Sequence, residues 1–247
     1  MQPPRADAGR AACPHDRGRN GEILTRLTHK IARVTGTCRS ATQALLNGAD
    51  ADPELRRELL AGIDEKLQEL DLVVENIAAW RALELDTLLL ARQPLDLRSL
   101  LTPALARWQY VVTKRGLGWR AELPGQLPPV AVDPGRILQA LNNLLVNALD
   151  YTACGGAVSV RAAAQGSEVW IEVGNTGPGL SAEELAHVFE PCFSSVHQGR
   201  FPQGVGLGLA VARQLVERHD GRLTVDSETG QGLRFRIWLP QSTASSV

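Results

Sequence analysis

Apolar residues recur at helical spacing through the first third of the chain. Between residues 21 and 47, and again in a segment from about residue 53 to residue 90, the spacing alternates between three and four. These positions are Leu24, Leu27, Ile31, Val34, Cys38, Ala41 and Leu45, then Leu60, Ile63, Leu67, Leu70, Val74 and Ile77. Such a heptad pattern is typical of helices that pack along a narrow seam. Because Asp52 can cap a helix and Pro53 suits its first turn, residues 21–92 are predicted to form a helical hairpin.

Two such helices make only half of a hydrophobic core, because each narrow apolar stripe stays partly uncovered. A homodimer in which two hairpins form a four-helix bundle is the simplest way to bury both stripes. Residues 1–20 are polar and rich in arginine, glycine and proline, and they lack the apolar core of a signal peptide. They are predicted to form a disordered arm.

From residue 93 the pattern changes to mixed helices and strands. Alternating apolar positions predict strands near residues 117–123, 158–161, 169–173, 223–226 and 233–239, and helical patterns cover residues 97–112, 133–149 and 207–219. This order predicts an α+β fold for residues 93–240, in which helices cover one face of a mixed sheet. Residues 241–247 are predicted to be a frayed tail.

Four polar and glycine-rich clusters follow one another inside this second domain. They are Asn143–Asn147, Asn175–Leu180, Phe189–Phe193 and Gly204–Leu209. Asn143 and Asn147 are four residues apart and share a helix face, where an amide oxygen can hold a magnesium ion that bridges phosphates. The alternative is a pair of asparagines that solvates a helix surface.

The glycines of the second and fourth clusters suggest contact with a nucleotide. Gly177 and Gly179 let the backbone approach a flat ring closely, although a plain turn between strand and helix has the same composition. Gly204, Gly206 and Gly208 open a helix whose N–H groups favour a triphosphate. Residues 194–203 are polar and contain Gly199 and Pro202, which suits a flexible lid.

In this order the four clusters resemble the N, first-glycine, F and second-glycine boxes of the catalytic domain of sensor histidine kinases. That domain belongs to a wider ATPase group with gyrase, a heat-shock chaperone and a mismatch-repair protein. The resemblance covers about residues 92–240 and continues more weakly upstream to about residue 21. It implies ATP and Mg²⁺ as cofactors. The nucleotide-binding residues that it implies are Asn143, Asn147, Asn175, Gly177, Gly179, Phe189, Phe193, Gly204, Gly206, Leu207 and Gly208.

Within this resemblance, Asn147 coordinates magnesium and Asn143 supports the phosphates. Asn175 stands where the family has an aspartate that accepts a hydrogen bond from the adenine amino group, and its amide oxygen can still accept that bond while its nitrogen adds a donor. Phe189 and Phe193 either anchor the lid or pack in the core. Gly230 and Gly232 resemble the last box, which a hairpin turn explains equally well.

Two differences from the family concern charge and catalysis around the pocket. Asp150 stands where the family commonly has a basic residue, and a carboxylate near phosphates is unfavourable unless a metal or a partner offsets it. Asn143 stands where related hydrolases have a glutamate that activates water, and an amide is a poor general base. This difference favours phosphoryl transfer over hydrolysis.

His29 is the candidate phosphoacceptor, since it falls on an outward, f-type position of the first helix and an exposed neutral imidazole is a competent nucleophile. Residues 27–34 resemble the histidine box, with His29 at the phosphorylated position. Lys30 replaces the usual acidic neighbour, and Arg33 and Val34 replace the usual Thr or Asn and the following proline. The alternative is a solvated surface histidine.

The expected function is that of an ATP-dependent protein histidine kinase of a two-component system, which phosphorylates His29 and passes the group to an aspartate on a response-regulator receiver domain. The first alternative is an ATP-binding regulatory module without phosphotransfer, which Lys30, Arg33 and Asp150 favour. The second is a serine kinase of the anti-sigma type, which the long dimeric bundle disfavours.

Charge and composition narrow the possible binding partners and the location of the protein. A net charge of −1 argues against nucleic-acid binding, and no apolar run approaches the roughly 18 residues that span a bilayer. The four cysteines lack metal-ligand spacing, so reduced thiols and a cytoplasmic location are expected.

Overall fold

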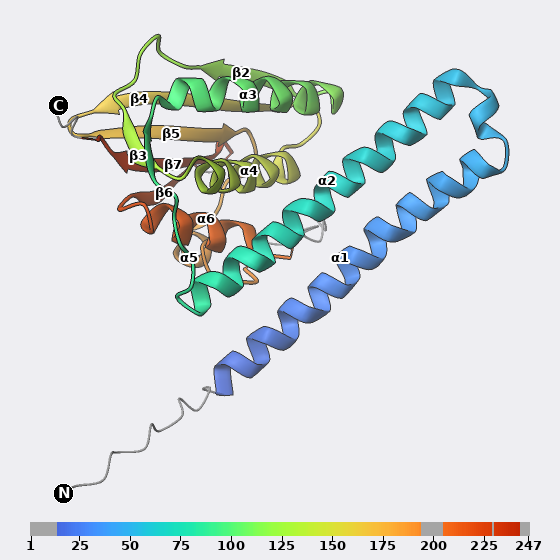
Figure 1. Ribbon diagram of the computed structural model, residues 1–247, viewed down its shortest axis with the longest axis horizontal. Coiled ribbons are helices and arrows are strands. Elements are labelled where there is room, and N and C mark those ends of the chain that lie inside the picture. Colours follow the sequence, from blue (N-terminus) through green and yellow to red (C-terminus); the bar gives the residue numbers. More distant parts are fainter. Residues whose placement is uncertain (1–13, 194–204, 229, 243–247) are drawn as a thin grey trace, which may run out of the picture.

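The computed structural model describes residues 14–193, 205–228 and 230–242. Two long helices, α1 (Pro14–Leu46) and α2 (Pro53–Glu84), form a hairpin that lies beside an α/β domain (Figure 1). A short 3₁₀ turn, η1 (Ala49–Ala51), joins the helices. The side chain of Asp52 accepts hydrogen bonds from the N–H groups of Glu54 and Leu55. The predicted break and helix cap between the two helices are therefore confirmed.

The helix ends differ from the sequence prediction at two places. Helix α1 begins at Pro14, so residues 14–20 are helical and not part of a disordered arm, whereas residues 1–13 lie outside the described part of the chain. Proline favours the first turn of a helix, and extending a long helix costs little once it is nucleated. Helix α2 ends at Glu84 and not near residue 90, because Asp86 adopts a left-handed backbone conformation with φ of 55°.

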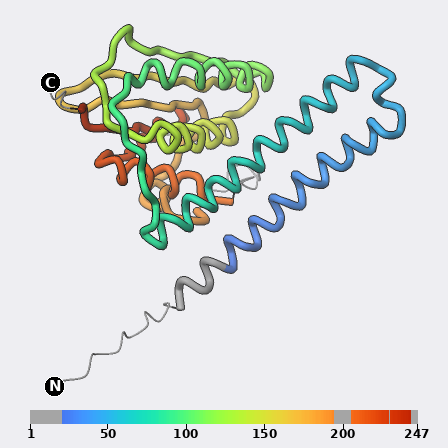
Figure 2. Tube along the Cα trace, viewed as in Figure 1, coloured from blue at the N-terminus to red at the C-terminus, as the bar shows by residue number. Residues whose placement is uncertain are grey.

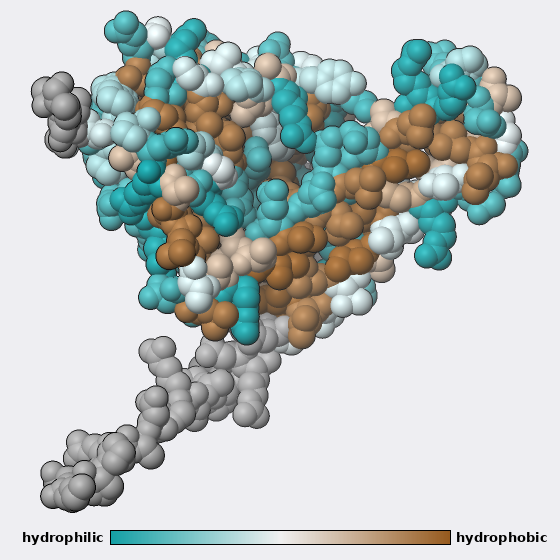
Figure 3. All heavy atoms as spheres, in the orientation of Figure 1, coloured by the Kyte–Doolittle hydropathy of each residue, from teal (hydrophilic) through white to brown (hydrophobic). Residues whose placement is uncertain are grey.

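The apolar seam of the hairpin is only partly as predicted. Leu27 and Val34 are buried, but Leu24 is 64% exposed and Ile31 is 42% exposed. On α2, Leu60, Leu67 and Val74 repeat every seven residues and are each about half exposed. We call these five residues the exposed stripe, and apolar surface follows the hairpin in Figure 3. Within one hairpin the buried positions of α1 include Ile23 and Lys30, and not Leu24 and Ile31.

The α/β domain contains a five-stranded sheet, and Figure 2 follows the chain through this domain and the hairpin beside it. The strand order is β2-β4-β5-β7-β6, with β2 parallel to β4 and all other neighbours antiparallel. The strands are β2 (Gly118–Glu122), β4 (Ala157–Gln165), β5 (Glu168–Asn175), β6 (Arg222–Glu228) and β7 (Gly232–Pro240). A separate antiparallel pair is formed by β1 (Gln93–Leu95) and β3 (Val130–Val132).

Three helices cover one face of this sheet (Figure 1). They are α3 (Leu97–Lys114), α4 (Pro134–Tyr151) and α6 (Gly208–Glu217), and a short helix, α5 (Ala182–His187), lies near α6. Four apolar residues of α4 are fully or almost fully buried; they are Ile137, Leu141, Leu144 and Ala148. The predicted fold class is therefore confirmed. Among the described residues, no helix is long and apolar enough to cross a membrane.

The segment between α2 and β1 is tied to the α/β domain by polar contacts. The N–H of Ala91 donates to the Asp133 carboxylate at 3.0 Å, Arg92 pairs with Asp220, and Arg218 pairs with Asp86. His219 is buried beneath this segment: its Nε2 accepts from the N–H of Asp133 at 3.0 Å, and its Nδ1 lies 2.7 Å from the carbonyl of Leu215. Since a carbonyl only accepts, Nδ1 carries the proton and the ring is neutral. His219 is thus a structural residue that joins α6 to the start of α4.

This environment predicts that the protein loses stability in acid through His219. Burial lowers the pKa of His219 below 6.5, although its hydrogen bond to Leu215 opposes the shift. The unfolded chain then binds more protons, so the free energy of unfolding falls as pH drops below 6.5, by up to about 1.4 kcal/mol per pH unit. Urea unfolding of wild type and His219→Gln at pH 7.5 and 5.5 measures the free energy of unfolding of each protein. The advantage of wild type over the variant should shrink at pH 5.5, and an unchanged difference would contradict the prediction.

Candidate functional site

Helix α4 contributes two asparagines to the candidate site. Asn143 is 4% exposed, and its Oδ1 lies so close to Gly208 that a Cβ at that glycine would be 3.2 Å away. Asn147, one turn further along α4, is half-buried and lines two neighbouring cavities. The shared helix face predicted for these residues is confirmed, and it points toward the N-terminus of α6.

The turn after β5 forms a second wall. Asn175, at the end of β5, is 7% exposed, and its Nδ2 donates to the carbonyl of Thr176 at 3.2 Å. One N–H of the amide nitrogen that was predicted to add a donor is therefore used within the turn. Gly179 has φ of 77°, and a Cβ there would lie 2.8 Å from the carbonyl oxygen of Glu228. Only glycine fits this position without displacing the β6 strand.

Gly232 lies close to the backbone of the same turn. It has φ of 97°, and a Cβ there would lie only 1.8 Å from the carbonyl oxygen of Asn175. Gly230, by contrast, lies in the turn between β6 and β7 with open space around it. Of the two explanations left open by the sequence, the hairpin turn accounts for Gly230, and close approach to the site accounts for Gly232.

The N-terminus of α6 forms the third wall. Asp52, Asp96, Asp133 and Ser181 cap helices α2 to α5 with side-chain hydrogen bonds, but Leu207 at the start of α6 makes no such bond. The N–H groups of its first turn therefore face the site without a side-chain cap, and a helix N-terminus of this kind attracts phosphate. Gly206 has φ of 79° and packs on the backbone of Cys192, which sets the angle at which the chain enters α6.

These walls surround two adjoining cavities. The smaller has a volume of about 40 Å³ and is lined by Asn147, Asn175, Gly177 and Gly179 together with Phe193. The larger, of about 1230 Å³, extends between α2, α3 and α4 and includes Asn143, Gly206, Leu207 and Gly208. Residues common to both cavities are Asn147, Tyr151, Pro178, Val188, Phe193 and Leu209. The structure thus brings together residues from all four sequence clusters.

The two phenylalanines have different surroundings. Phe193 lines both cavities, whereas Phe189 lines neither and packs edge-on against Phe235 in the core, with a centroid distance of 6.1 Å. Arg213 lies over the Phe189 ring at 5.5 Å. Gly204 and the predicted lid of residues 194–203 lie outside the described residues.

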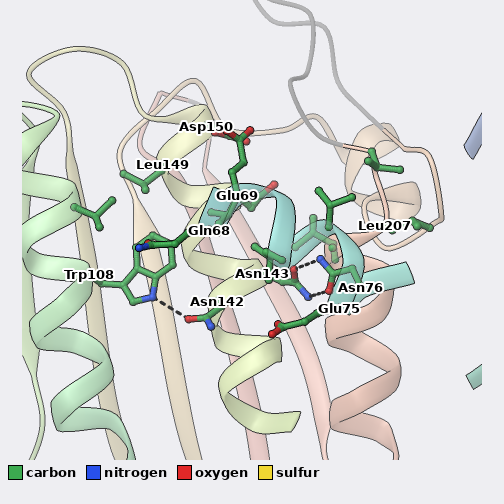
Figure 4. A pocket seen from close by; sticks show the side chains of 18 of the residues that line it. Gln68, Glu69, Glu75, Asn76, Trp108, Asn142, Asn143, Leu149, Asp150 and Leu207 are labelled. Carbon is green, nitrogen blue, oxygen red and sulfur yellow. Dashed lines mark hydrogen bonds between the residues drawn. The ribbon is translucent and has the colours of Figure 1, made fainter. Parts of the chain in front are cut away.

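Asp150 faces the hairpin across the larger cavity. Lys30 and Glu69 of the hairpin line the same cavity as Asp150 (Figure 4). Desolvation raises the pKa of the Asp150 carboxyl, while the positive charges of Lys30, Arg115, Arg33 and Lys66 oppose the rise. These cations are the partners that offset a carboxylate at this end of α4. Asp150 is not among the residues that line the smaller cavity.

Lys30 is a core residue of the hairpin, which the sequence did not suggest. It is 8% exposed and forms an ion pair with Glu69 of α2, which also accepts from Lys66 at 2.8 Å. Desolvation lowers the pKa of Lys30 to about 8, Arg33 acts in the same direction, and Asp150 opposes it. A carboxylate introduced at position 30 would therefore face Glu69, so the acidic neighbour usual beside the histidine cannot simply be restored in this chain.

Lys30→Glu is accordingly expected to lower the free energy of unfolding by about 3 kcal/mol, because it breaks a largely buried pair and leaves two carboxylates together. Chemical denaturation of wild type and variant measures the loss. Lys30→Glu combined with Glu69→Lys should recover most of it, and a single variant as stable as wild type would show that the pair does not support the hairpin.

His29 lies on the outer face of α1 and is exposed, as its f-type position predicted. It is not among the residues that line either cavity, although its neighbours Leu27 and Lys30 line the larger one. In this structure the candidate acceptor and the candidate nucleotide site of one chain are therefore separate.

Asn76 of α2 is the site residue that sequence reasoning missed. It is buried, and its amide pairs with that of Asn143 (Figure 4). In the sequence it sits between Val74 and Ile77 as one of many polar residues on an amphipathic helix. Its local pattern carries no signal, because the contact joins residues 67 positions apart.

The donor set fits a magnesium ion that is held mainly by nucleotide phosphates. Within the described residues, no group of three or more His, Cys, Asp or Glu side chains could hold a metal, and Cys38, Cys154 and Cys192 form no disulfide bond. Magnesium usually keeps several waters and binds through one or two protein oxygens plus phosphates. The amide oxygen of Asn147, beside the uncapped end of α6, suits that role.

Comparison with known proteins agrees with this geometry. Residues 132–243 match the family described as histidine kinase-, DNA gyrase B-, and HSP90-like ATPase. The chain is 30% identical over 220 residues to the alginate biosynthesis sensor protein KinB of Pseudomonas aeruginosa, covering 89% of this chain and 36% of KinB. It is 31% identical over 231 residues to the adaptive-response sensory kinase SasA of Synechococcus sp. strain JA-2-3B'a(2-13), covering 88% of this chain and 58% of SasA.

Solved structures of histidine kinases also resemble this chain. The crystal structure of full-length ShkA in complex with AMPPNP is 27% identical, with a TM-score of 0.62, and covers 91% of this chain and 46% of ShkA. The catalytic domain of histidine kinase ThkA is 25% identical, with a TM-score of 0.53, and covers 61% of this chain and 95% of that domain. The chain thus spans about a third to somewhat over half of the length of the curated relatives compared above.

Proposed function

The chain belongs to the sensor histidine kinases, as a transmitter core with a gyrase- and HSP90-like ATPase domain, and from this we propose that it transfers the γ-phosphoryl group of ATP to His29. The observation that carries the proposal is the meeting of three walls at two adjoining cavities: the Asn143 and Asn147 face of α4, the Asn175 turn, and the uncapped N-terminus of α6. Each wall supplies the groups that one part of ATP requires.

In this proposal the adenine lies against Gly177 and Gly179, and its amino group donates to Oδ1 of Asn175. The Nδ2 of Asn175 is oriented by its bond to Thr176, which directs the oxygen toward the ligand. The phosphates bind the N–H groups of α6 and the amide of Asn143. Magnesium, held by Asn147, neutralises charge that develops on the phosphates.

The transfer step balances without a further reagent. A nitrogen of the neutral His29 imidazole attacks the γ-phosphorus, an N–P bond forms, and the bond between that phosphorus and the bridging oxygen to the β-phosphate breaks. ADP leaves and the imidazole proton passes to solvent. Because His29 lines neither cavity, the proposal requires either a movement of the ATP domain or transfer to the His29 of a second copy.

We propose that the phosphoryl group then passes to an aspartate of a response-regulator receiver domain. Support comes from the relatives, which are named sensor proteins and sensory kinases. We also propose that the protein acts in the cytoplasm, where ATP is available as the phosphoryl donor.

Incubation with Mg²⁺ and ATP labelled at either the γ or the α phosphate tests the proposal. Label should enter the protein from γ-labelled ATP and not from α-labelled ATP. ATP binding without incorporation from either would support the alternative, an ATP-binding module without phosphotransfer. Lys30 favours that alternative. It stands directly after His29, where the family has an acidic residue, and it forms an ion pair with Glu69.

The hairpin is proposed to dimerise through the exposed stripe of Leu24, Ile31, Leu60, Leu67 and Val74. These side chains are 42% to 64% exposed and repeat at heptad spacing, as expected of a surface that packs against identical helices. Burying them in a four-helix bundle would stabilise the assembly by about 0.025 kcal/mol per Å² of apolar surface.

Leu67→Glu is therefore expected to convert a dimer into a monomer of 26.7 kDa. Light scattering coupled to size-exclusion chromatography measures the mass. Ala61→Glu introduces the same charge at an exposed position of α2 outside the stripe and should leave the dimer intact. A monomeric wild type, or dimers of both variants, would refute dimerisation through this surface.

A further inference from the structure

A buried network of amides joins the hairpin to the nucleotide site (Figure 4). Asn76 of α2 donates from Nδ2 to Oδ1 of Asn143 at 2.6 Å, and Asn143 donates from Nδ2 to Oδ1 of Asn76 at 2.8 Å. The same oxygen of Asn76 accepts from Nε2 of Gln139 at 3.2 Å. All three residues are at most 8% exposed.

The orientation of each amide in this network is fixed by Arg136. Its Nη1 donates to Oε1 of Gln139 at 3.0 Å, and a guanidinium can only donate. The nitrogen of Gln139 must therefore face Asn76, which places the oxygen of Asn76 toward Gln139 and its nitrogen toward Asn143. The amides cannot be flipped without leaving a buried donor against a donor.

The network lies at the end of the site where the phosphates are proposed to bind. Asn76, Asn143 and Gly208 line the same cavity, and the oxygen of Asn143 lies next to the first residue of α6. Asn76 engages the oxygen and one N–H of the Asn143 amide. Asn143 therefore has to release at least one of these bonds before its amide can turn toward a triphosphate.

The hairpin also contacts the α/β domain through two apolar residues of α2, Ala79 and Leu83, which belong to the buried core cluster, and through exposed polar pairs. Gln68 accepts from Arg107 at 2.6 Å and Glu65 pairs with Arg115 at 3.1 Å, and both contacts are exposed. Exposed polar pairs contribute little, whereas a buried amide network is stable only when every member is paired. A ligand that binds the amide of Asn143 would break its hydrogen bonds to Asn76. It would therefore weaken the buried amide network and leave the exposed pairs unchanged.

We propose that Asn76 is a positioning residue that makes docking of the hairpin and binding of a nucleoside triphosphate compete for the amide of Asn143. The inference rests on the proposed function, because it requires that Asn143 contacts the phosphates of ATP. While Asn76 holds Asn143, the triphosphate binds only to the fraction of molecules in which the pair is open, which weakens its apparent affinity. By reciprocity, the bound triphosphate weakens the docking of α2 on the ATP domain by the same factor.

Isothermal titration of wild type, Asn76→Ala and Gln68→Ala with AMPPNP and with adenosine tests the proposal. Asn76→Ala should bind AMPPNP about tenfold more tightly, since the competition is removed, while adenosine, which lacks phosphates, should bind as it does to wild type. Gln68→Ala also removes an amide of α2 that contacts the ATP domain and should change neither affinity. A general loosening of structure would alter both ligands together, so the ratio of the two affinities isolates the role of Asn76.

Equal changes for AMPPNP and adenosine, or weaker binding of AMPPNP, would overturn the proposal. If Asn76→Ala does not give the circular dichroism of the wild type, Asn76→Leu, which keeps a similar volume without hydrogen bonds, is judged by the same ratio. Failure of wild type to bind either ligand would refute the proposed nucleotide site itself. Binding of both ligands with an unchanged ratio would refute only the competition at Asn143.

Discussion

Replacing His29 with alanine is expected to abolish incorporation of the γ-phosphoryl group while ATP still binds. His29 is exposed on the outer face of α1 and lines neither cavity, so its removal leaves the nucleotide site intact. The alanine side chain has no nucleophile, so labelling should fall to background, at least about a hundredfold below wild type. Filter binding of protein incubated with γ-labelled ATP and Mg²⁺ measures the loss, and titration with AMPPNP measures binding.

His187→Ala is the matched control for this variant. His187 is also an exposed histidine, paired with Glu190 at 2.9 Å in the ATP domain, and its removal should leave labelling near the wild-type level. Wild-type labelling in His29→Ala would show that another residue accepts the phosphoryl group. Equal losses in both variants would show that the assay reports structural damage and not the acceptor.

Replacing Asn147 with alanine is expected to produce the second large effect, a loss of phosphoryl transfer of about 10²-fold or more. Asn147 lines both cavities and is the amide proposed to hold magnesium. Loss of one group that stabilises transition-state charge typically costs 10²–10³ in rate. ATP should also lose most of its Mg²⁺-dependent stabilisation of the fold, which thermal unfolding with ATP in the presence and absence of Mg²⁺ measures.

Asn142→Ala controls for loss of an asparagine from the same helix. Asn142 accepts a hydrogen bond from Nε1 of Trp108 at 2.9 Å and thus joins α4 to α3. This variant should lower stability modestly and keep the response to Mg²⁺. An Asn147→Ala protein that keeps both its labelling rate and its Mg²⁺ response would place the metal elsewhere.

Local chemistry explains why most of the fold and the pocket could be predicted from sequence. Asp52, Asp133 and Ser181 act as helix caps within three residues of their partners. The glycine turns were recognised because positive φ and close backbone approach require glycine, as at Gly179 and Gly206. Each of these features depends on neighbours in the sequence, so a pattern along the chain is sufficient to find it.

Features that depend on distant contacts were missed or only partly predicted. The heptad spacing identified the hairpin helices but not which residues pack within one hairpin, so the burial of Ile23 and Lys30 was not predicted. Lys30 resembles a surface lysine until Glu69 of α2 is placed beside it. Asn76 resembles a surface amide until α2 docks on α4. In each case tertiary packing decides the role, and the local sequence is compatible with both.

The most direct test of the central claim is the chemical stability of the label that the protein acquires from γ-labelled ATP. A phosphoryl group on an imidazole nitrogen is lost when the nitrogen is protonated, so the label should disappear in acid and persist in base. A serine ester would behave in the opposite way. Acid-labile, base-stable label on wild type that is absent from His29→Ala is the predicted result; acid-stable label, or no label on a protein that binds ATP, would contradict the assignment as a histidine kinase that uses His29.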